Sequence, residues 1–234
     1  MTTSATSGLR PIKKRPAEQL TADELRRLIT TGQLPPGSRI TEASVAQQFD
    51  VSRGTLRAAL QQLSQEGLIV LTPYTGWTVM SIQPQDLWEL FTLRAALESM
   101  AGKLAIEKLT PEGAQALEDT FEQLLVARHK GEPDDVVVDR DFNIHKMIVE
   151  LAGHRRLREH YRMVEQQIRL FVASTYVDMK DPNTTLDSHG AIVQAIVQKD
   201  VALATHLLEE HSIGEGKRVF KLLSMVLNEN TPTL

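Results

Sequence analysis

Apolar residues in the first part of the chain recur at helical spacing and predict three short helices. The first covers Ala17 to Thr31 and is ended by Gly32 and by the following Pro35-Pro36-Gly37. A second, short helix is expected after Thr41, which is a suitable N-cap residue. The third follows Ser52, another good N-cap, so these segments predict a compact helical unit.

The third helix has two chemically different faces. Leu56, Leu60 and Leu63 share a side that is suited to burial. Arg53 and Arg57 are four residues apart and therefore share another side. A short helix with an apolar back and guanidinium groups near its N-terminal end fits the major groove of DNA. Arginine pairs are also common on ordinary surface helices, so this pattern alone leaves both interpretations open.

Two β-rich runs follow the third helix and predict a hairpin. They cover Leu68–Thr72 and Trp77–Ser81, and Pro73-Tyr74-Thr75-Gly76 supplies the turn residues between them. Three helices and a hairpin within about eighty residues predict a winged helix-turn-helix. The tip of the hairpin, near Tyr74 to Gly76, is expected to reach the adjacent minor groove or the DNA backbone.

From Pro84 onward the sequence has almost no β signal. Its periodicity and capping residues predict six helices with short breaks between them, over residues 84–109, 111–130, 134–153, 155–177, 185–198 and 200–227. Short connections between helices favour antiparallel neighbours. The expected fold class is all-α with a small β wing: an N-terminal winged helix-turn-helix and a C-terminal antiparallel six-helix bundle.

These patterns divide the chain of 234 residues into four parts. We expect a disordered N-terminal tail over residues 1–15, a DNA-binding domain over 16–81, a linker over 82–85 and a helical effector domain over 86–228. The charge is uneven, because residues 1–83 contain nine Lys and Arg against six Asp and Glu, whereas the rest contains 17 against 24. That asymmetry fits one domain that faces DNA and one that does not.

Composition excludes several classes of protein. There is no cysteine, so disulfides and thiolate metal sites are excluded. No apolar run approaches the roughly 18 residues that a membrane span needs, and the N-terminus lacks the apolar region of a secretory signal. The chain is therefore expected to be cytoplasmic, without a membrane partner.

A long motif extends over the helical unit. It reads Gly32-x-Leu34-x-Pro36-Gly37-Ser38-Arg39-Ile40 and then Val51-Ser52-Arg53-x-Thr55-Leu56-Arg57-x-Ala59-Leu60-x-x-Leu63-x-x-Glu66-Gly67-Leu68. This motif resembles the N-terminal domain of GntR-type bacterial transcription regulators. The resemblance implies that the recognition helix opens with Ser52, Arg53, Thr55 and Arg57, and that Gly76 lies at the tip of the wing. We expect a homodimer that binds a short palindromic operator in double-stranded DNA.

The second half contains four residues that could hold a metal: Asp141, His145, His189 and His211. Asp141 and His145 are four residues apart, so both side chains lean toward the same space. One carboxylate and three imidazoles that converge inside a bundle would bind a divalent cation, with Zn²⁺ or Ni²⁺ expected and Mn²⁺ or Fe²⁺ as alternatives. An Asp–His pair at this spacing is also common as a surface ion pair, and the sequence cannot show that the helices converge.

Several short patterns bring these residues into one family. They are Arg94-x-x-x-Glu98, Asp141-x-x-Ile144-His145, His189-x-x-Ile192-x-x-Ala195-Ile196-x-x-x-Asp200 and the segment from Ala204 to His211. Together they resemble the all-helical FCD-type effector domain of the FadR branch of GntR regulators, in its metal-binding version. The resemblance implies Asp141, His145, His189 and His211 as ligands, and Arg94 beside the same cavity as a contact for the effector. The remaining histidines do not match ligand positions and are interpreted as surface or packing residues: His129, His154, His160 and His206.

These observations predict a ligand-responsive transcription regulator, with repression the commoner outcome in the family, that senses a small carboxylate effector at a metal-containing cavity. Such a site fits sensing, because we find no motif that marks the general base of a metal-dependent hydrolase. Two alternatives remain open at this point. One is a metal-dependent hydrolase or lyase that uses the Asp/His cluster, and the other is a regulator whose bundle holds no metal.

Overall fold

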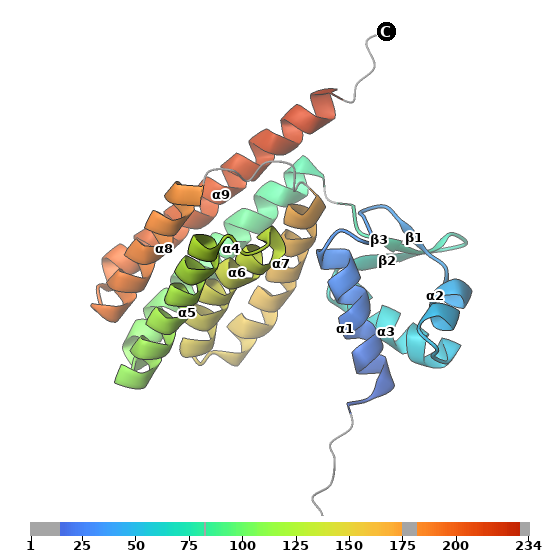
Figure 1. The fold of residues 1–234 in the computed structure, drawn as a ribbon, viewed down its shortest axis with the longest axis horizontal. Coiled ribbons are helices and arrows are strands. Elements are labelled where there is room, and N and C mark those ends of the chain that lie inside the picture. The colour runs from blue at the N-terminus through green and yellow to red at the C-terminus, as the bar shows by residue number, and fades with distance from the viewer. Residues whose placement is uncertain (1–14, 82, 175–181, 230–234) are drawn as a thin grey trace, which may run out of the picture.

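The computed structural model describes residues 15–81, 83–174 and 182–229 of the chain. The elements along the chain are α1 (Ala17–Thr30), β1 (Arg39–Ile40), α2 (Glu42–Gln48), α3 (Arg53–Gln65), β2 (Ile69–Thr72), β3 (Gly76–Val79), α4 (Pro84–Lys108), α5 (Pro111–Lys130), α6 (Asp134–Leu151), α7 (Arg155–Ser174), α8 (Pro182–Val197) and α9 (Val201–Glu229). Figure 1 shows two groups, with α1 to β3 on one side and the helices α4 to α9 on the other. The predicted fold class is confirmed. The predicted tail lies outside the described residues except for Arg15, and the predicted linker does so at residue 82.

The N-terminal group is organised around α3. Ser52 caps this helix, because its Oγ accepts a hydrogen bond of 3.1 Å from the backbone N–H of Thr55. Leu56, Leu60 and Leu63 are fully buried on the inner side of α3, as their spacing predicts. The outer side of α3 is thereby left for other contacts.

A three-stranded antiparallel sheet of order β1-β3-β2 completes this group. The pairing of β2 and β3 runs from Ile69 opposite Val79 to Thr72 opposite Gly76. The tip is a tight turn in which Tyr74 and Gly76 have positive φ angles of 65° and 89°. The sequence analysis did not predict β1, because two residues are too few to produce an alternating pattern.

The C-terminal group is the predicted bundle of six helices, in which α4 and α9 pack closely along each other. Two predicted boundaries were wrong or extend beyond what the structure describes. α8 begins at Pro182 and not at residue 185, since proline is well suited to the first turn of a helix. α7 is described up to Ser174, and the predicted end of this helix at Val177 lies outside the described residues. No described helix meets the length and apolarity that crossing a bilayer would need.

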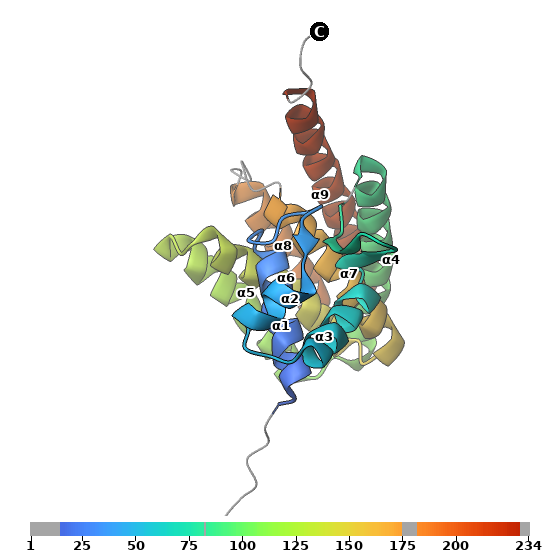
Figure 2. The ribbon, with the colours of Figure 1, turned by 90° about the vertical axis from the view of Figure 1, so that its right-hand side faces the viewer.

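Helix α7 joins the two groups. It contacts α4 and α6 in the bundle and α1 in the N-terminal group, and Figure 2 shows α1 to α3 in front of the bundle. Leu170 of α7 is fully buried in the apolar core of the N-terminal group. Arg162 of α7 donates a hydrogen bond of 3.1 Å to Glu66, and Arg26 of α1 donates two hydrogen bonds of 2.8 Å to the same carboxylate. The two groups therefore share apolar and charged contacts through α7.

Candidate metal centre and nucleic-acid interface

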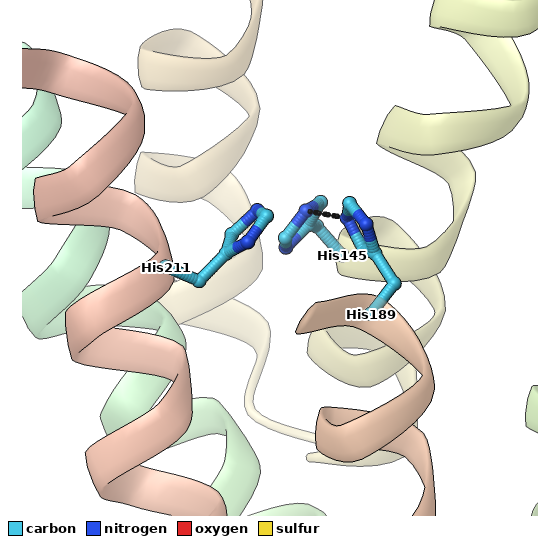
Figure 3. A group of neighbouring side chains, drawn as sticks. All are labelled: His145, His189 and His211. Atoms are coloured by element: carbon cyan, nitrogen blue, oxygen red, sulfur yellow. Dashed lines mark hydrogen bonds between the residues drawn. The ribbon is translucent and has the colours of Figure 1, made fainter. Parts of the chain in front are cut away.

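Three histidines from three helices meet inside the bundle (Figure 3). His145 comes from α6, His189 from α8 and His211 from α9, and all three are buried. The ring centroids are 4.4 to 5.0 Å apart. The structure thus brings together residues that are separated by up to 66 positions in the sequence.

The nitrogen atoms of the three rings approach one another at spacings that suit a shared cation. Nε2 of His145 lies 2.9 Å from Nε2 of His189, and one ligand atom from each of the three rings lies within 4.8 Å of the others. The carboxylate of Asp141, one turn before His145 on α6, lies 3.5 Å from Nε2 of His189. Ligand bonds of about 2.1 Å at tetrahedral or right angles place neighbouring ligand atoms roughly 3.0–3.4 Å apart. The four predicted residues therefore form one cluster.

Neighbouring polar groups orient two of these rings. Oε2 of Glu98, a buried residue of α4, lies 3.0 Å from Nδ1 of His145. Oγ of Ser188 is hydrogen-bonded at 2.9 Å to Nδ1 of His211. In each case a polar group lies within 3.0 Å of Nδ1, although the geometry at His145 is not that of a hydrogen bond, and Nε2 is turned toward the cluster. This is the arrangement by which proteins fix the orientation of metal-binding histidines.

The environment of the Nε2 atom of His211 also supports a metal site. This atom is buried and has no hydrogen-bond partner among the residues that the structure describes. Burial lowers the pKa of His211 well below its usual range, and the nearby His189 and His145 lower it further against the opposing effect of Glu215. A neutral imidazole is the form that binds metals. The donor set of three imidazoles and one carboxylate therefore fits a divalent cation.

Arg94 of α4 lies beside this cluster, as the family resemblance implies, but its guanidinium already binds two carboxylates. Its Nε donates to Glu98 at 2.7 Å and its Nη1 donates to Glu215 at 2.8 Å. The side chain is 1% exposed, and its Nη2 has no hydrogen-bond partner in the described part of the bundle. Burial opposes the charge of Glu98, but Arg94 and His145 prevail and hold the pKa of Glu98 far below its usual range. For Glu215 the same competition, with His211 and Arg94 as the main attracting groups, gives a pKa of about 2.

A small cavity adjoins the cluster. Its volume is about 30 Å³, which is room for about one or two water molecules. The polar and charged residues of its wall are Arg94, Arg128, Asp141, Glu215 and Arg218. Asp141 and Glu215 connect the cavity to the histidines, because Glu215 lies 3.7 Å from His211 and Asp141 lies 3.5 Å from His189. A small molecule in an enlarged form of this cavity would contact both the cation site and the arginines.

The residues predicted to bind DNA lie at the start of α3 and at the tip of the wing. Ser52 and Arg53 are exposed, and no hydrogen bond or ion pair of Arg53 is found among the described residues. Arg57 is exposed too, but it is held by the carboxylate of Glu42 at 2.7 and 3.2 Å. Ser52 and Thr55 are engaged with each other in the cap of α3.

Glu42 links the two halves of this surface. Its carboxylate accepts from Arg57 of α3 and, at 3.0 Å, from the indole Nε1 of Trp77 of β3. Gly76 stands at the wing tip with open space around it, next to the fully exposed Tyr74. Among the described residues, the surface therefore presents Arg53 without a hydrogen bond or ion pair and Arg57 as a guanidinium that is tied to the wing through Glu42.

Sequence reasoning missed three charged residues of the site and named a fourth, Glu98, only as part of a motif, without a role. Glu98 and Glu215 bind Arg94, while Arg128 and Arg218 line the cavity. Glu215 follows His211 by four residues, which is the same spacing that singled out Asp141 and His145, so this signal was available. Arg128 had none, because only the packing of α5 against α6 brings it to the cavity.

Comparison with known families assigns both halves of the chain. Residues 17–79 match the family described as "Bacterial regulatory proteins, gntR family". Residues 89–213 match the FCD domain. The two matches coincide with the N-terminal group and with the helical bundle.

Individual relatives match over most of their length. The HTH-type transcriptional regulator McbR of Escherichia coli (strain K12) is 31% identical over 194 residues, which cover 80% of this chain and 86% of that protein. The gluconate operon transcriptional repressor of Bacillus subtilis (strain 168) is 28% identical over 199 residues, covering 81% and 79%. The solved structure titled "E. coli McbR/YncC" has a TM-score of 0.79 at 22% identity and covers 90% of this chain and 100% of that one, which shows the same fold.

Proposed function

The chain belongs to the GntR family of bacterial regulatory proteins and carries an FCD domain, and from that premise we propose that it is a homodimer whose hold on an operator is controlled by a small organic acid. It is a transcription regulator and not an enzyme, because both families and the named relatives are regulators. The alternative of a hydrolase or lyase is therefore set aside. The observation that carries the proposal is the cluster of three imidazoles and Asp141 beside a cavity that Arg94 lines.

The metal would be held by His145, His189, His211 and Asp141. Nitrogen and oxygen donors without thiolates favour Zn²⁺ or Ni²⁺, with Mn²⁺ and Fe²⁺ as alternatives. Bound there, the cation would offer open coordination positions to the carboxylate of an organic acid. Arg94 would contribute one donor to an oxygen of that acid, because only its Nη2 lacks a hydrogen-bond partner among the described residues. Gluconate, which the name of the Bacillus relative contains, is one hydroxy acid of this kind.

Helix α7 offers a path from the cavity to DNA. Ile168 lines the cavity, whereas Leu170, two residues later, is buried in the core of the N-terminal group. Gln167 lies against Gly67, at the end of α3, where an added Cβ would come within 2.1 Å of its side chain. A shift of α7 would therefore move the recognition helix. Couplings of this kind are typically about 1–3 kcal/mol, or roughly 5- to 150-fold in affinity.

We expect the double variant Arg53→Ala/Arg57→Ala to lose operator binding at about 0.15 M salt. Removal of an arginine that contacts a base or a phosphate lowers the binding free energy by about 1–3 kcal/mol, and a dimer loses each contact twice. Arg53→Ala alone should weaken operator binding more than Arg57→Ala alone, because Arg57 is held by Glu42. Fluorescence anisotropy on duplexes selected by the wild-type protein from a random library measures this.

The control for this prediction is Arg27→Ala. Arg27 lies on α1, pairs with Glu24 and faces the cleft between the two groups. Its removal takes away the same charge without touching α3, so affinity should fall less than about threefold. A double variant of Arg53 and Arg57 that still binds the selected duplex as the wild type does would refute the DNA-binding assignment.

The regulatory proposal is tested by release of the same duplex. Wild-type protein loaded with Zn²⁺ is titrated with D-gluconate, citrate and L-lactate, and the titrations are repeated after treatment with EDTA. We expect at least one acid to change DNA affinity by fivefold or more with metal and not after EDTA. A thermal-shift screen with a wider set of organic acids chooses further probes. If no acid that raises the melting temperature changes the affinity for DNA, the proposal that the cavity controls DNA binding is refuted.

A further inference from the structure

The wall of the cavity contains three arginines and two carboxylates. Arg94, Arg128 and Arg218 face it, together with Asp141 and Glu215. Asp141 belongs to the proposed metal centre. Glu215 is shared between Arg94 and Arg218, at 2.8 and 3.2 Å. Arg128 is therefore left without a carboxylate.

The contacts of Arg128 support this count. Its Nε is buried and has no hydrogen-bond partner, and no hydrogen bond or ion pair of its guanidinium is found in the described part of the chain. A buried donor without a partner is unfavourable. Such a group at a cavity wall points to a ligand that supplies the missing acceptor.

The place of Arg128 differs from that of Arg94. Arg94 is 1% exposed and is fixed from both sides by Glu98 and Glu215. Arg128 lies in the last turn of α5 and is only partly buried, and it also lines an open hollow on the outer surface, next to Lys130 and Glu132. The cavity therefore has an arginine fixed by two carboxylates at one end, and at the side of the outer hollow it has a partly exposed arginine that no ion pair holds among the described residues. Movement of Arg128 outward would enlarge a space that now holds only a few atoms.

From these observations we infer that Arg128 is a second anion-binding residue of the effector cavity, and that the effector is a dicarboxylate. One carboxylate would lie at the end near the histidines and Arg94, and the other would meet Arg128 at the side of the outer hollow. This inference rests on the proposed function, because it places the effector in the same cavity. It adds to that proposal the number of carboxylates on the ligand and the residue that binds the second carboxylate.

The test compares each acid with its own monoamide. Malonate, succinate and glutarate are paired with malonamate, succinamate and glutaramate, which keep the size but have one carboxylate fewer. Binding to the Zn²⁺-loaded, full-length protein is measured by calorimetry. The wild type should bind at least one dicarboxylate about 10- to 100-fold more tightly than its monoamide, and Arg128→Met should abolish that preference while monoamide affinity changes less than about threefold.

Two further variants make the outcome specific. Arg128→Lys keeps the charge and should recover part of the preference, though it loses the forked geometry of the guanidinium. Lys130→Met removes a cation from the same turn but does not line the cavity, so it should behave as the wild type. Urea denaturation of all three variants checks that the bundle is intact.

The inference is overturned if the wild type binds no dicarboxylate of this series, if the monoamides bind as tightly, or if Arg128→Met weakens both forms equally. Failure of the proposed function would be seen separately, as a wild-type protein that contains no metal or whose DNA binding responds to no acid. A monocarboxylate that binds with metal and releases DNA would leave the proposed function standing and refute the role of Arg128.

Discussion

Replacing Arg94 with methionine is expected to lower the free energy of unfolding of the metal-free protein by about 3–5 kcal/mol. Arg94 is the cation between two buried carboxylates, Glu98 at 0% exposure and Glu215 at 13%. Its removal leaves Glu98 without a guanidinium partner and leaves Glu215 with Arg218 alone, at 3.2 Å. The loss of one member of a buried ion pair is far more harmful than the loss of both. Urea denaturation followed by circular dichroism measures the change.

The cause of that loss can be separated from the loss of packing. The triple variant Arg94→Met/Glu98→Gln/Glu215→Gln removes the unpaired charges and should regain at least half of the lost stability, since amides are cheaper to bury than carboxylates. Arg27→Met, at an exposed pair with Glu24, should change the free energy of unfolding by less than about 0.5 kcal/mol. A loss below about 1 kcal/mol for Arg94→Met would mean that the buried carboxylates do not depend on this arginine.

The second large effect concerns the metal. At a free Zn²⁺ concentration about 1,000 times the Kd, the wild type should gain about 4 kcal/mol of stability, which corresponds to roughly 10 °C in Tm. EDTA should reverse the gain. His189→Ala should abolish it, because this ring lies between His145 and Asp141, at 2.9 and 3.5 Å. Elemental analysis of wild-type protein purified without chelator should find one metal ion per chain.

A second histidine serves as the control. His206 is exposed on α9, five residues before His211, and pairs with Glu210 at the surface. His206→Ala should keep both the metal and the increase in Tm. Equal, sub-stoichiometric metal in the wild type and in His189→Ala would contradict the metal centre and would favour a regulator whose bundle holds no metal.

Local patterns were sufficient for most of the fold. The start of α3 follows from a side-chain cap at Ser52, and the start of α5 follows from the same kind of cap at Thr110. The buried face of α3 follows from leucines at helical spacing. The errors arose where the signal is short or ambiguous, as at β1 and at Pro182. Both are places where contacts with other elements, or a residue that tolerates several conformations, decide the boundary.

The site depends on a different kind of information. The residues Asp141, His145, His189 and His211 were found because their order resembles that of a family, since nothing local says that α6, α8 and α9 converge. The partners of Arg94 are another example: Glu98 is a neighbour on the same helix, but Glu215 is 121 residues away. The tie between Arg57 and Glu42, and the open position of Arg53, are equally invisible in the sequence.

By itself, the sequence determined the order and faces of the helices, the hairpin, the division of charge and the types of donor available to a metal. These are properties of spacing along one chain, and helical and strand periodicity translate them directly into structure. Only the tertiary structure decided which charges neutralise one another: Glu215 occupies Arg94, and Arg128 has no carboxylate among the described residues. It also decided that α7 lies between the cavity and the end of the recognition helix. Electrostatic and packing energies depend on distance and burial in space, and residues far apart in the sequence acquire both only when the helices pack.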